Sequence, residues 1–263
     1  MNFPASGNGD LAVLPLPAFN DNYIWALRRG NLAVVVDPGD AQVVEDWLGE
    51  NGIDLTAILI THHHTDHTGG IAALTTQRDI PVYGPAAHDI RGVTQGVSEG
   101  DRITLPSLGL GFEVLEVPGH TATHIAFLGH GMLFPGDTLF SAGCGRLLGG
   151  TAQQLYRSLE RLKGLPGDTR VYCTHEYTLS NLRFARAAEP SNAERDAWLE
   201  RCQALRDKGL PTLPSTIARE CAINPFLRTE CVEVRAGVAA HDGRPPRDGE
   251  DCFTRLRAWK DSF

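Results

Sequence analysis

Four histidines and one aspartate fall within six residues of this chain, directly after a short apolar run that predicts a buried strand. In extended backbone, side chains two residues apart point to the same side, so His62 and His64 can share one cation. Asp66 and His67 follow where the chain turns into a glycine-rich helix start, so we expect them to bind a second cation. A solvated polar loop is the alternative, and this concentration of ligand residues disfavours it.

Two ions need more ligands than this segment holds, and the ends of three later apolar runs supply them. Each run is followed by a histidine or an aspartate, in the order His120, Asp137 and His175. In α/β proteins such groups gather beyond the strand ends, where loops converge. A carboxylate has two oxygens, so we expect Asp137 to bridge both cations. The predicted ligands of the first ion are His62, His64 and His120, and those of the second are Asp66, His67 and His175.

The remaining histidines and a loop cysteine receive structural interpretations. His63 lies between two ligands with its side chain on the opposite side, so we predict a packing or supporting role. For His124, at the start of a strand, a structural hydrogen bond is favoured over metal binding. Cys144 could be a nucleophile, but nothing nearby in the sequence argues for a lowered pKa, so a plain loop thiol is favoured. We expect three histidines at the surface: His88, His130 and His241.

Short apolar runs that alternate with glycine and proline must position these ligands over the first 180 residues. They predict a hairpin of residues 23–27 and 32–36. Further strands are predicted at residues 55–60, 80–83, 111–117, 124–128, 132–134 and 170–173, and helices at 41–49, 70–74 and 152–162. Interleaved strands and helices of this kind predict a layered α/β domain.

Beyond about residue 178 the pattern becomes helical. Ser191 and Glu194 fit a capping box before a helix whose apolar face holds Trp198 and Cys202. A last amphipathic helix is predicted over residues 248–263. No linker is obvious, and Glu189-Pro190 is the nearest candidate.

Composition excludes several classes of protein. The 263 residues are 42% hydrophobic and 21% charged, which indicates a globular chain with a full core. The net charge of −8 argues against a nucleic-acid partner. Residues 1–180 hold 10 basic and 19 acidic side chains, whereas residues 181–263 hold 14 and 13. An anionic ligand therefore meets less repulsion in the last third.

Location and redox state follow from what the sequence lacks. No apolar run is long enough to cross a bilayer, and residues 1–10 show no leader pattern. We therefore expect a cytoplasmic protein with no membrane partner, which is expected to be a monomer. The six cysteines form no CxxC pair, so we expect reduced thiols.

The ligand motifs carry a resemblance. The segment THHHTDHTGG at residues 61–70 resembles the THxHxDH signature of the metallo-β-lactamase superfamily, and GHT, GDT and THEY fall where its later ligands occur. Within that superfamily the chain is similar to the glyoxalase II (hydroxyacylglutathione hydrolase) family over nearly its whole length. The segments that carry this similarity are FNDNY at 19–23, GDTLFSAGCGR at 136–146, HEYTLSNL at 175–182, PST at 214–216 and NPF at 224–226.

This resemblance implies a fold and a reaction. The fold is an αββα sandwich of residues 1–178, the catalytic domain, followed by a small all-α domain of residues 179–263 that helps to bind substrate. The reaction is hydrolysis of S-(2-hydroxyacyl)glutathione thioesters, chiefly S-D-lactoylglutathione to D-lactate and glutathione, in methylglyoxal detoxification. A hydroxide bridging two divalent metal ions would be the nucleophile, with Asp66 and Asp137 as catalytic ligands. Zinc is expected first, with iron or manganese possible.

The resemblance also implies substrate contacts, at Arg146, Tyr177, Arg257 and Lys260. Arg257 and Lys260 are three residues apart on the last predicted helix, so both cations can meet one carboxylated ligand. Arg146 stands where related sequences often have lysine, and Leu148 stands where many have an aromatic residue.

Three other functions compete with this one. A glutathione persulfide dioxygenase of the same superfamily would need one iron, and the second set of ligands argues against it. A nuclease would need a basic groove, which the acidic first 180 residues disfavour. A non-catalytic metal-binding protein would not need seven ligands.

Overall fold

The computed structural model describes residues 10–263, so the expectation about the first residues lies almost entirely outside it. The chain divides into two compact units. Unit 1 comprises the described residues up to Leu115 together with Ile125–His130, and unit 2 comprises Glu116–His124 and Gly131–Phe263. The functional boundary expected at residue 178 is a different division, and it stays a prediction.

Unit 1 contains a six-stranded sheet. In sheet order its strands are β1 (Ala12–Ala18), β2 (Asn22–Arg29), β3 (Leu32–Val36), β4 (Asp54–Leu59), β5 (Val82–Pro85) and β6 (Gln95–Val97). The predicted hairpin is confirmed as the antiparallel pair β2 and β3, and β3 to β6 run parallel. Strand β1 was not among the predicted strands, and it contains Pro15 and Pro17. Its place at the sheet edge tolerates prolines, which cannot donate to a ladder.

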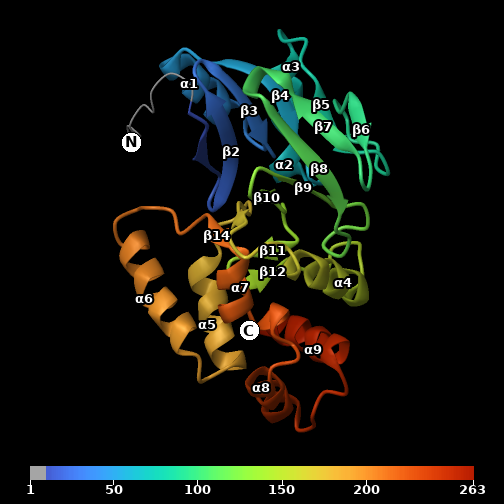
Figure 1. Cartoon of the computed structure of the whole chain (residues 1–263), viewed down its shortest axis with the longest axis vertical. Helices are drawn as coiled ribbons and strands as arrows, with labels where there is room; N and C mark the ends of the chain where they lie inside the picture. Colours follow the sequence, from blue (N-terminus) through green and yellow to red (C-terminus); the bar gives the residue numbers. More distant parts are fainter. Residues whose placement is uncertain (1–9) are drawn as a thin grey trace. The chain divides into compact units, whose positions relative to one another are not determined.

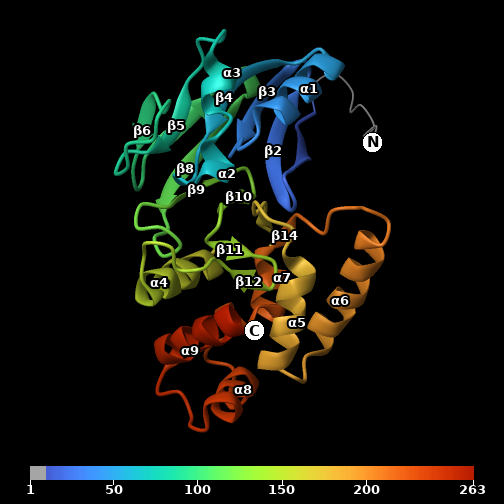
Figure 2. The ribbon, with the colours of Figure 1, turned by 180° about the vertical axis from the view of Figure 1, so that it is seen from behind.

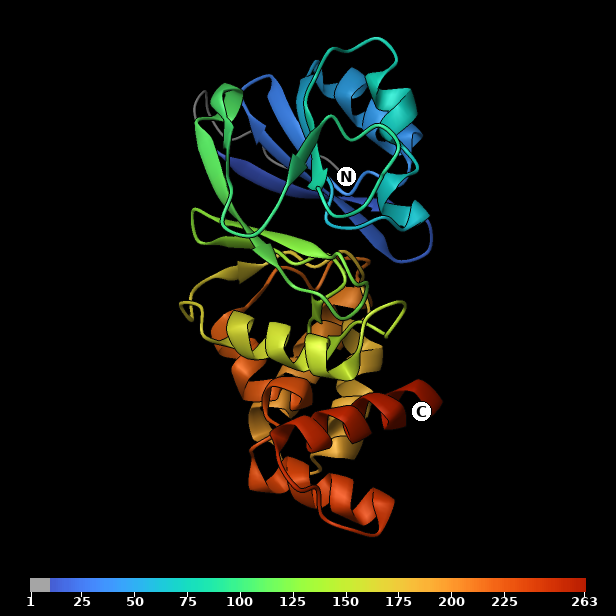
Figure 3. The ribbon, with the colours of Figure 1, turned by 90° about the vertical axis from the view of Figure 1, so that its right-hand side faces the viewer.

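Both faces of this sheet are covered within unit 1 (Figures 2 and 3). Helices α1 (Ala41–Asn51) and α3 (Ile71–Thr75) pack on one face, where their buried leucine and isoleucine side chains join the strands in one apolar cluster. The other face meets β7 (Arg102–Leu105), η1 (Pro106–Leu108), β8 (Leu110–Glu116) and β9 (Ile125–Gly129). Thr56 Oγ1 of β4 lies 2.8 Å from Ser107 Oγ at this junction. The short helix α2 (Thr65–Thr68) follows β4.

Unit 2 combines short strands with most of the helices (Figure 1). Its strands are β10 (Met132–Phe134), β13 (Arg170–Val171) and β14 (Ser215–Thr216), which pair in the order β14-β13-β10, and the two-stranded hairpin of β11 (Leu139–Phe140) and β12 (Gly143–Cys144). Its helices are α4 (Ala152–Lys163), α5 (Thr178–Ala188), α6 (Ala193–Arg206), α7 (Ile217–Ile223), η2 (Pro225–Leu227), α8 (Val232–Asp242) and α9 (Gly249–Ser262). Helix α9 packs against α4 and α8, and α5 packs against α6.

Two local predictions in the helical segment are corrected. The first residue of α6 is capped by Asn192, whose side chain accepts a hydrogen bond from the Arg195 backbone N–H, so the Ser191 capping box is wrong by one residue. Glu189 does not begin a linker, because its buried carboxylate lies 2.7 Å from Arg228 Nη2 inside unit 2. The last helix agrees with its prediction, and the Asp248 side chain caps it.

The cysteines and the helices allow two further checks. The structure of residues 10–263 contains no disulfide bond, which agrees with the expected reduced thiols. In the same residues, every helix is too short or too polar to cross a membrane.

Candidate metal and substrate-binding site

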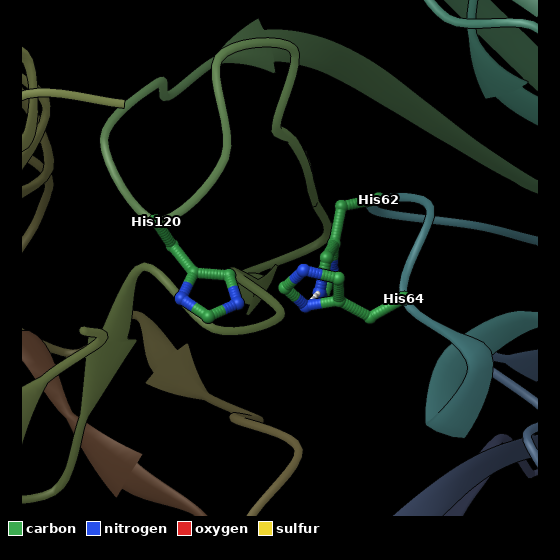
Figure 4. A group of neighbouring side chains, drawn as sticks. All are labelled: His62, His64 and His120. Atoms are coloured by element: carbon green, nitrogen blue, oxygen red, sulfur yellow. Dashed lines mark hydrogen bonds between the residues drawn. The ribbon is translucent and has the colours of Figure 1, made fainter. Parts of the chain in front are cut away.

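The first ligand group, His62, His64, Asp66 and His67, lies in unit 1 directly after β4. The rings of His62 and His64 converge (Figure 4), and His62 Nε2 lies 3.0 Å from His64 Nδ1. In the short helix that follows, Asp66 Oδ2 lies 3.5 Å from His67 Nε2. Two ligand atoms on one tetrahedral zinc ion, each about 2.0–2.1 Å from it, are separated by about 3.3 Å. Each pair therefore has the spacing of two ligands on one ion.

Asp37 is a residue of the candidate site that sequence reasoning missed. This buried aspartate follows β3 and accepts hydrogen bonds from the backbone N–H and the hydroxyl of Thr61, each at 2.8 Å. Its Oδ2 also lies 3.1 Å from His67 Nδ1. A carboxylate only accepts, so an acidic oxygen at this distance favours the tautomer with the proton on His67 Nδ1, which would leave the Nε2 lone pair for a metal. The sequence signal is an aspartate that directly follows the strand predicted at residues 32–36.

Asn22 adds a second support to this group. Its side-chain amide donates a 3.1 Å hydrogen bond to Asp66 Oδ2. This contact fixes the orientation of a half-buried carboxylate that belongs to the predicted ligands. The hairpin of β1 and β2 thereby helps to position the motif after β4.

The second ligand group, His120, Asp137 and His175, lies in unit 2 and comes from loops after β8, β10 and β13. All three side chains are buried. Asp137 Oδ2 lies 3.5 Å from His120 Nε2 and 3.3 Å from His175 Nε2. One carboxylate thus stands between two imidazole nitrogens, as a bridging ligand would.

Backbone groups orient this second group. His120 Nδ1 lies 2.8 Å from the carbonyl oxygen of Arg146, which can only accept, so His120 Nε2 is left as a metal donor. His124 Nε2 accepts a 3.1 Å hydrogen bond from the Asp137 backbone N–H. The structural role predicted for His124 is therefore confirmed.

The four predicted substrate residues all lie in unit 2, in different environments. Tyr177 is half-buried and stacks on His175 with 4.7 Å between ring centroids. The Arg146 side chain is exposed. Arg257 is buried, and its guanidinium donates to the Cys144 carbonyl at 3.0 Å and to Asp261 Oδ1 at 2.8 Å.

Lys260 is the fourth of these residues. Its half-buried ammonium group lies 3.4 Å from the Ser180 carbonyl oxygen and 5.2 Å from the Phe184 ring centroid. Burial first, and then the neighbouring Arg257 charge, lower the pKa of Lys260 to about 8. Lys260 is therefore a cation whose charge depends on pH near neutrality.

The residues given structural roles behave accordingly. His63 stacks on His88 at 4.0 Å between ring centroids. Cys144 is buried, and this burial raises the pKa of its thiol to about 11, which argues against a nucleophile. The three histidines predicted at the surface are exposed: His88, His130 and His241.

Comparisons with known proteins define the class of the molecule. The model of the metallo-β-lactamase superfamily matches residues 19–175, and that of the hydroxyacylglutathione hydrolase C-terminus matches residues 176–263. The structure of ETHE1 from Myxococcus xanthus is similar with a TM-score of 0.63 and 26% identity, covering 96% of this chain and 99% of that one. The structure of TTHA1623 in a di-iron-bound form is similar with a TM-score of 0.58 and 27% identity, covering 82% of this chain and 100% of that one. The class is a metallo-β-lactamase fold followed by a helical carboxy-terminal segment, as predicted.

The sequence of a curated relative narrows the class to a family. The hydroxyacylglutathione hydrolase of Cupriavidus taiwanensis is 54% identical over 96% of this chain and 99% of its own length. The chain therefore belongs to the hydroxyacylglutathione hydrolase family of the metallo-β-lactamase superfamily.

Proposed function

We propose that this protein hydrolyses S-(2-hydroxyacyl)glutathione thioesters, chiefly S-D-lactoylglutathione to D-lactate and glutathione, and so completes methylglyoxal detoxification. Family membership supports the reaction. The observation that carries the proposal is that predicted ligands contact predicted substrate residues within unit 2. The His120 ring is hydrogen-bonded to the backbone of Arg146, and Tyr177 stacks on His175.

The donor set fits two divalent ions. The proposed ligands are His62, His64 and His120 for one ion, Asp66, His67 and His175 for the other, and Asp137 for both. Bound ions supply Lewis acidity toward a carbonyl oxygen and lower the pKa of water. Histidine and carboxylate donors suit zinc, which we place first, and also iron or manganese. The di-iron-bound structure named above keeps iron as an alternative.

The chain's own residues would orient the reactants. Asn22 holds the Asp66 carboxylate, which is placed to orient the attacking water. Arg146 and Lys260 are cations that would bind the carboxylates of glutathione. The leaving thiol has an ordinary pKa of about 8.5, so its departure as a thiolate needs no strong general acid.

The proposal assigns different roles to the two parts of the chain. Residues 1–178 would carry out the chemistry and residues 179–263 would complete the substrate site, since Lys260 lies on the last helix. The cytoplasmic location and the monomeric state stay predictions.

The alternatives are less favoured on the same residues. A persulfide dioxygenase with one iron would leave the ligands proposed for the second ion unused. Within those ligands, Asp66 with His67 and Asp137 with His175 both have the spacing of two ligands on one ion. A non-catalytic metal protein would not need a tyrosine stacked on a ligand histidine.

Metal analysis combined with a thioester assay tests the proposal. The purified protein should contain two equivalents of metal and should remove the thioester absorbance of S-D-lactoylglutathione. Treatment with a chelator should abolish this activity, and added zinc, iron or manganese should restore it. A metal-replete, folded protein without thioesterase activity would refute the proposed function.

A further inference from the structure

The β11–β12 hairpin of unit 2 is held by buried polar side chains from several helices. The Ala142 backbone N–H donates to Glu220 Oε2 at 2.7 Å. Asn224 Nδ2 donates to the carbonyl oxygens of Phe140 and Gly143, at 3.2 and 2.9 Å. Such contacts act on the backbone of the hairpin, so they fix its path rather than the packing of one side chain.

Glu220 is the centre of this arrangement. Its side chain is fully buried on α7, and its carboxylate also accepts hydrogen bonds from the Ser215 hydroxyl and from Asn224 Nδ2. Taking a carboxylate out of water is costly unless its hydrogen bonds are made. The residue it holds, Ala142, has a φ of 54°, a left-handed conformation that is strained for a residue with a Cβ. The buried Glu220 carboxylate, whose removal from water is costly, therefore holds a strained turn at Ala142.

The far end of the hairpin touches two predicted ligands. A Cβ atom on Gly145 would lie 2.0 Å from the Asp137 carbonyl oxygen and 3.1 Å from His120 Nδ1. The next residue, Arg146, provides the carbonyl that orients the His120 ring. Displacement of the hairpin would therefore move the partner of one ligand and the backbone of another.

We propose that Glu220 is a positioning residue, which fixes the β11–β12 hairpin through Ala142 and thereby orients His120 and Asp137 for metal binding. The inference rests on the metal site of the proposed function. It assigns to helix α7 a task at the metal site, although α7 provides none of the predicted metal ligands or substrate contacts.

A purely structural role for Glu220 is the alternative, and Glu189 offers the matched control. Glu189 is equally buried in unit 2, and it pairs with Arg228. In the described structure its carboxylate accepts hydrogen bonds from Arg228, Asn192 and Cys231, away from the hairpin. Removal of either carboxylate should lower the melting temperature, but only the loss of Glu220 should affect the ligands.

The experiment compares Glu220→Ala, Glu220→Gln and Glu189→Ala with the natural full chain. Zinc affinity is measured by chelator competition, and hydrogen exchange of residues 139–146 is measured in metal-free protein. Glu220→Ala should weaken the binding of at least one ion about 10- to 100-fold, the usual effect of losing a supporting group, and should speed exchange at Ala142. Glu220→Gln should stay within about threefold, because a glutamine can accept from Ala142 and donate to Ser215. Glu189→Ala should keep both zinc affinity and the protection of the hairpin.

Two further variants keep the test decisive. If Glu220→Ala does not fold, Asn224→Ser removes the amide donor, keeps a capping oxygen, and should give the same two changes. Ala142→Gly relieves the left-handed strain and should recover part of the lost affinity in either background.

Normal zinc affinity and normal protection of the hairpin in Glu220→Ala, or in Asn224→Ser where Glu220→Ala does not fold, would overturn the inference. So would an equal loss in Glu189→Ala. If the natural chain binds zinc but does not hydrolyse the thioester, the proposed function fails, and the affinity comparison still decides the role of Glu220.

Discussion

The two ligand groups are built in different ways. The group of unit 1 comes from one segment of six residues, and its supports come from the same sheet, with Asn22 in β2 and Asp37 directly after β3. The group of unit 2 comes from three separate loops, and side chains of later helices hold the β11–β12 hairpin that follows the loop of Asp137. The first is therefore organised within one sheet, and the second depends on the tertiary structure of the helical segment.

This difference indicates how substitutions should act. A change near the first group should affect only the residues it touches. A change in the helical segment should reach the second group through the backbone of the hairpin. The following predictions use single substitutions to test this contrast, in order of decreasing effect.

Asp137→Ala should have the largest effect, because this carboxylate stands between two histidines and is proposed to bridge both ions. Loss of a supporting group alone costs about 10- to 100-fold, so loss of a shared ligand should lower kcat by more than about 100-fold. Metal content should fall at both positions. Two equivalents of metal and near-normal turnover would show that Asp137 is not shared.

Asp37→Ala should have the next largest effect, confined to the first group. It removes the acceptor for His67 Nδ1 and for both donors of Thr61, so zinc affinity should fall about 10- to 100-fold. The free energy of unfolding should fall by about 1–3 kcal/mol, because buried donors lose their partner. Chelator competition and urea unfolding measure the two effects.

Asp37→Asn is the matched control for this change. Asp37 has a φ of 52°, which asparagine tolerates better than alanine, and the amide oxygen can still accept one of the hydrogen bonds. The asparagine variant should lose less zinc affinity and less free energy of unfolding than Asp37→Ala. Unchanged zinc affinity in both variants would show that the support of His67 has no effect on metal binding.

Lys260 should affect substrate binding in a pH-dependent manner. Burial lowers its pKa to about 8, so the ammonium form that attracts a carboxylate is present below this pH and is lost above it. A hydrogen bond to a charged group contributes about 1.5–3 kcal/mol, so KM for glutathione thioesters should rise about tenfold or more as the pH rises through this range.

Two variants provide the controls for Lys260. Lys260→Arg stays charged, so its KM should not show this rise. Lys260→Met should have a high KM at every pH, with metal content unchanged. A KM for the natural chain that rises no more than that of the arginine variant would exclude Lys260 from substrate binding.

The sequence predicts that the histidines of the first group lie together, and the structure places His62 beside His64. This pair lies beyond β4, which ends at Leu59, so its orientation depends on the bend at residues 61 and 62 as well as on the extended backbone of His64. Asp37 was missed because its contact with His67 depends on the pairing of β3 with β4, which a local pattern does not contain.

Long-range contacts explain what the sequence left open in unit 2. Glu220 and Asn224 resemble ordinary helix residues in sequence, and only the fold brings them to Ala142 and Gly143. The spacing of Arg257 and Lys260 correctly predicts one helix. It does not show that the Arg257 guanidinium donates to the backbone of Cys144 while Lys260 has a different environment.

His63→Ala should have the smallest effect, although the residue lies inside the ligand motif. Its ring stacks on His88 at 4.0 Å between centroids, whereas the rings of its neighbours His62 and His64 converge on each other. The His63 ring also meets the His64 ring edge-on at 4.9 Å between centroids, and each partly exposed ring contact usually contributes less than about 1.5 kcal/mol. Both ions should therefore be retained, and kcat should stay within about threefold of the natural value.

The neighbouring histidines make this prediction a strict test of strand alternation. His62→Ala and His64→Ala should each lose metal from the first group, because each removes a nitrogen of a pair with ligand spacing. His88→Ala removes the stacking contact from the other side but keeps the contact of His63 with His64, so its melting temperature should fall no further than that of His63→Ala. Metal analysis of the four variants separates the two roles. If His63→Ala loses as much metal as His62→Ala while His88→Ala does not, His63 acts on the metals directly and the alternation was assigned wrongly.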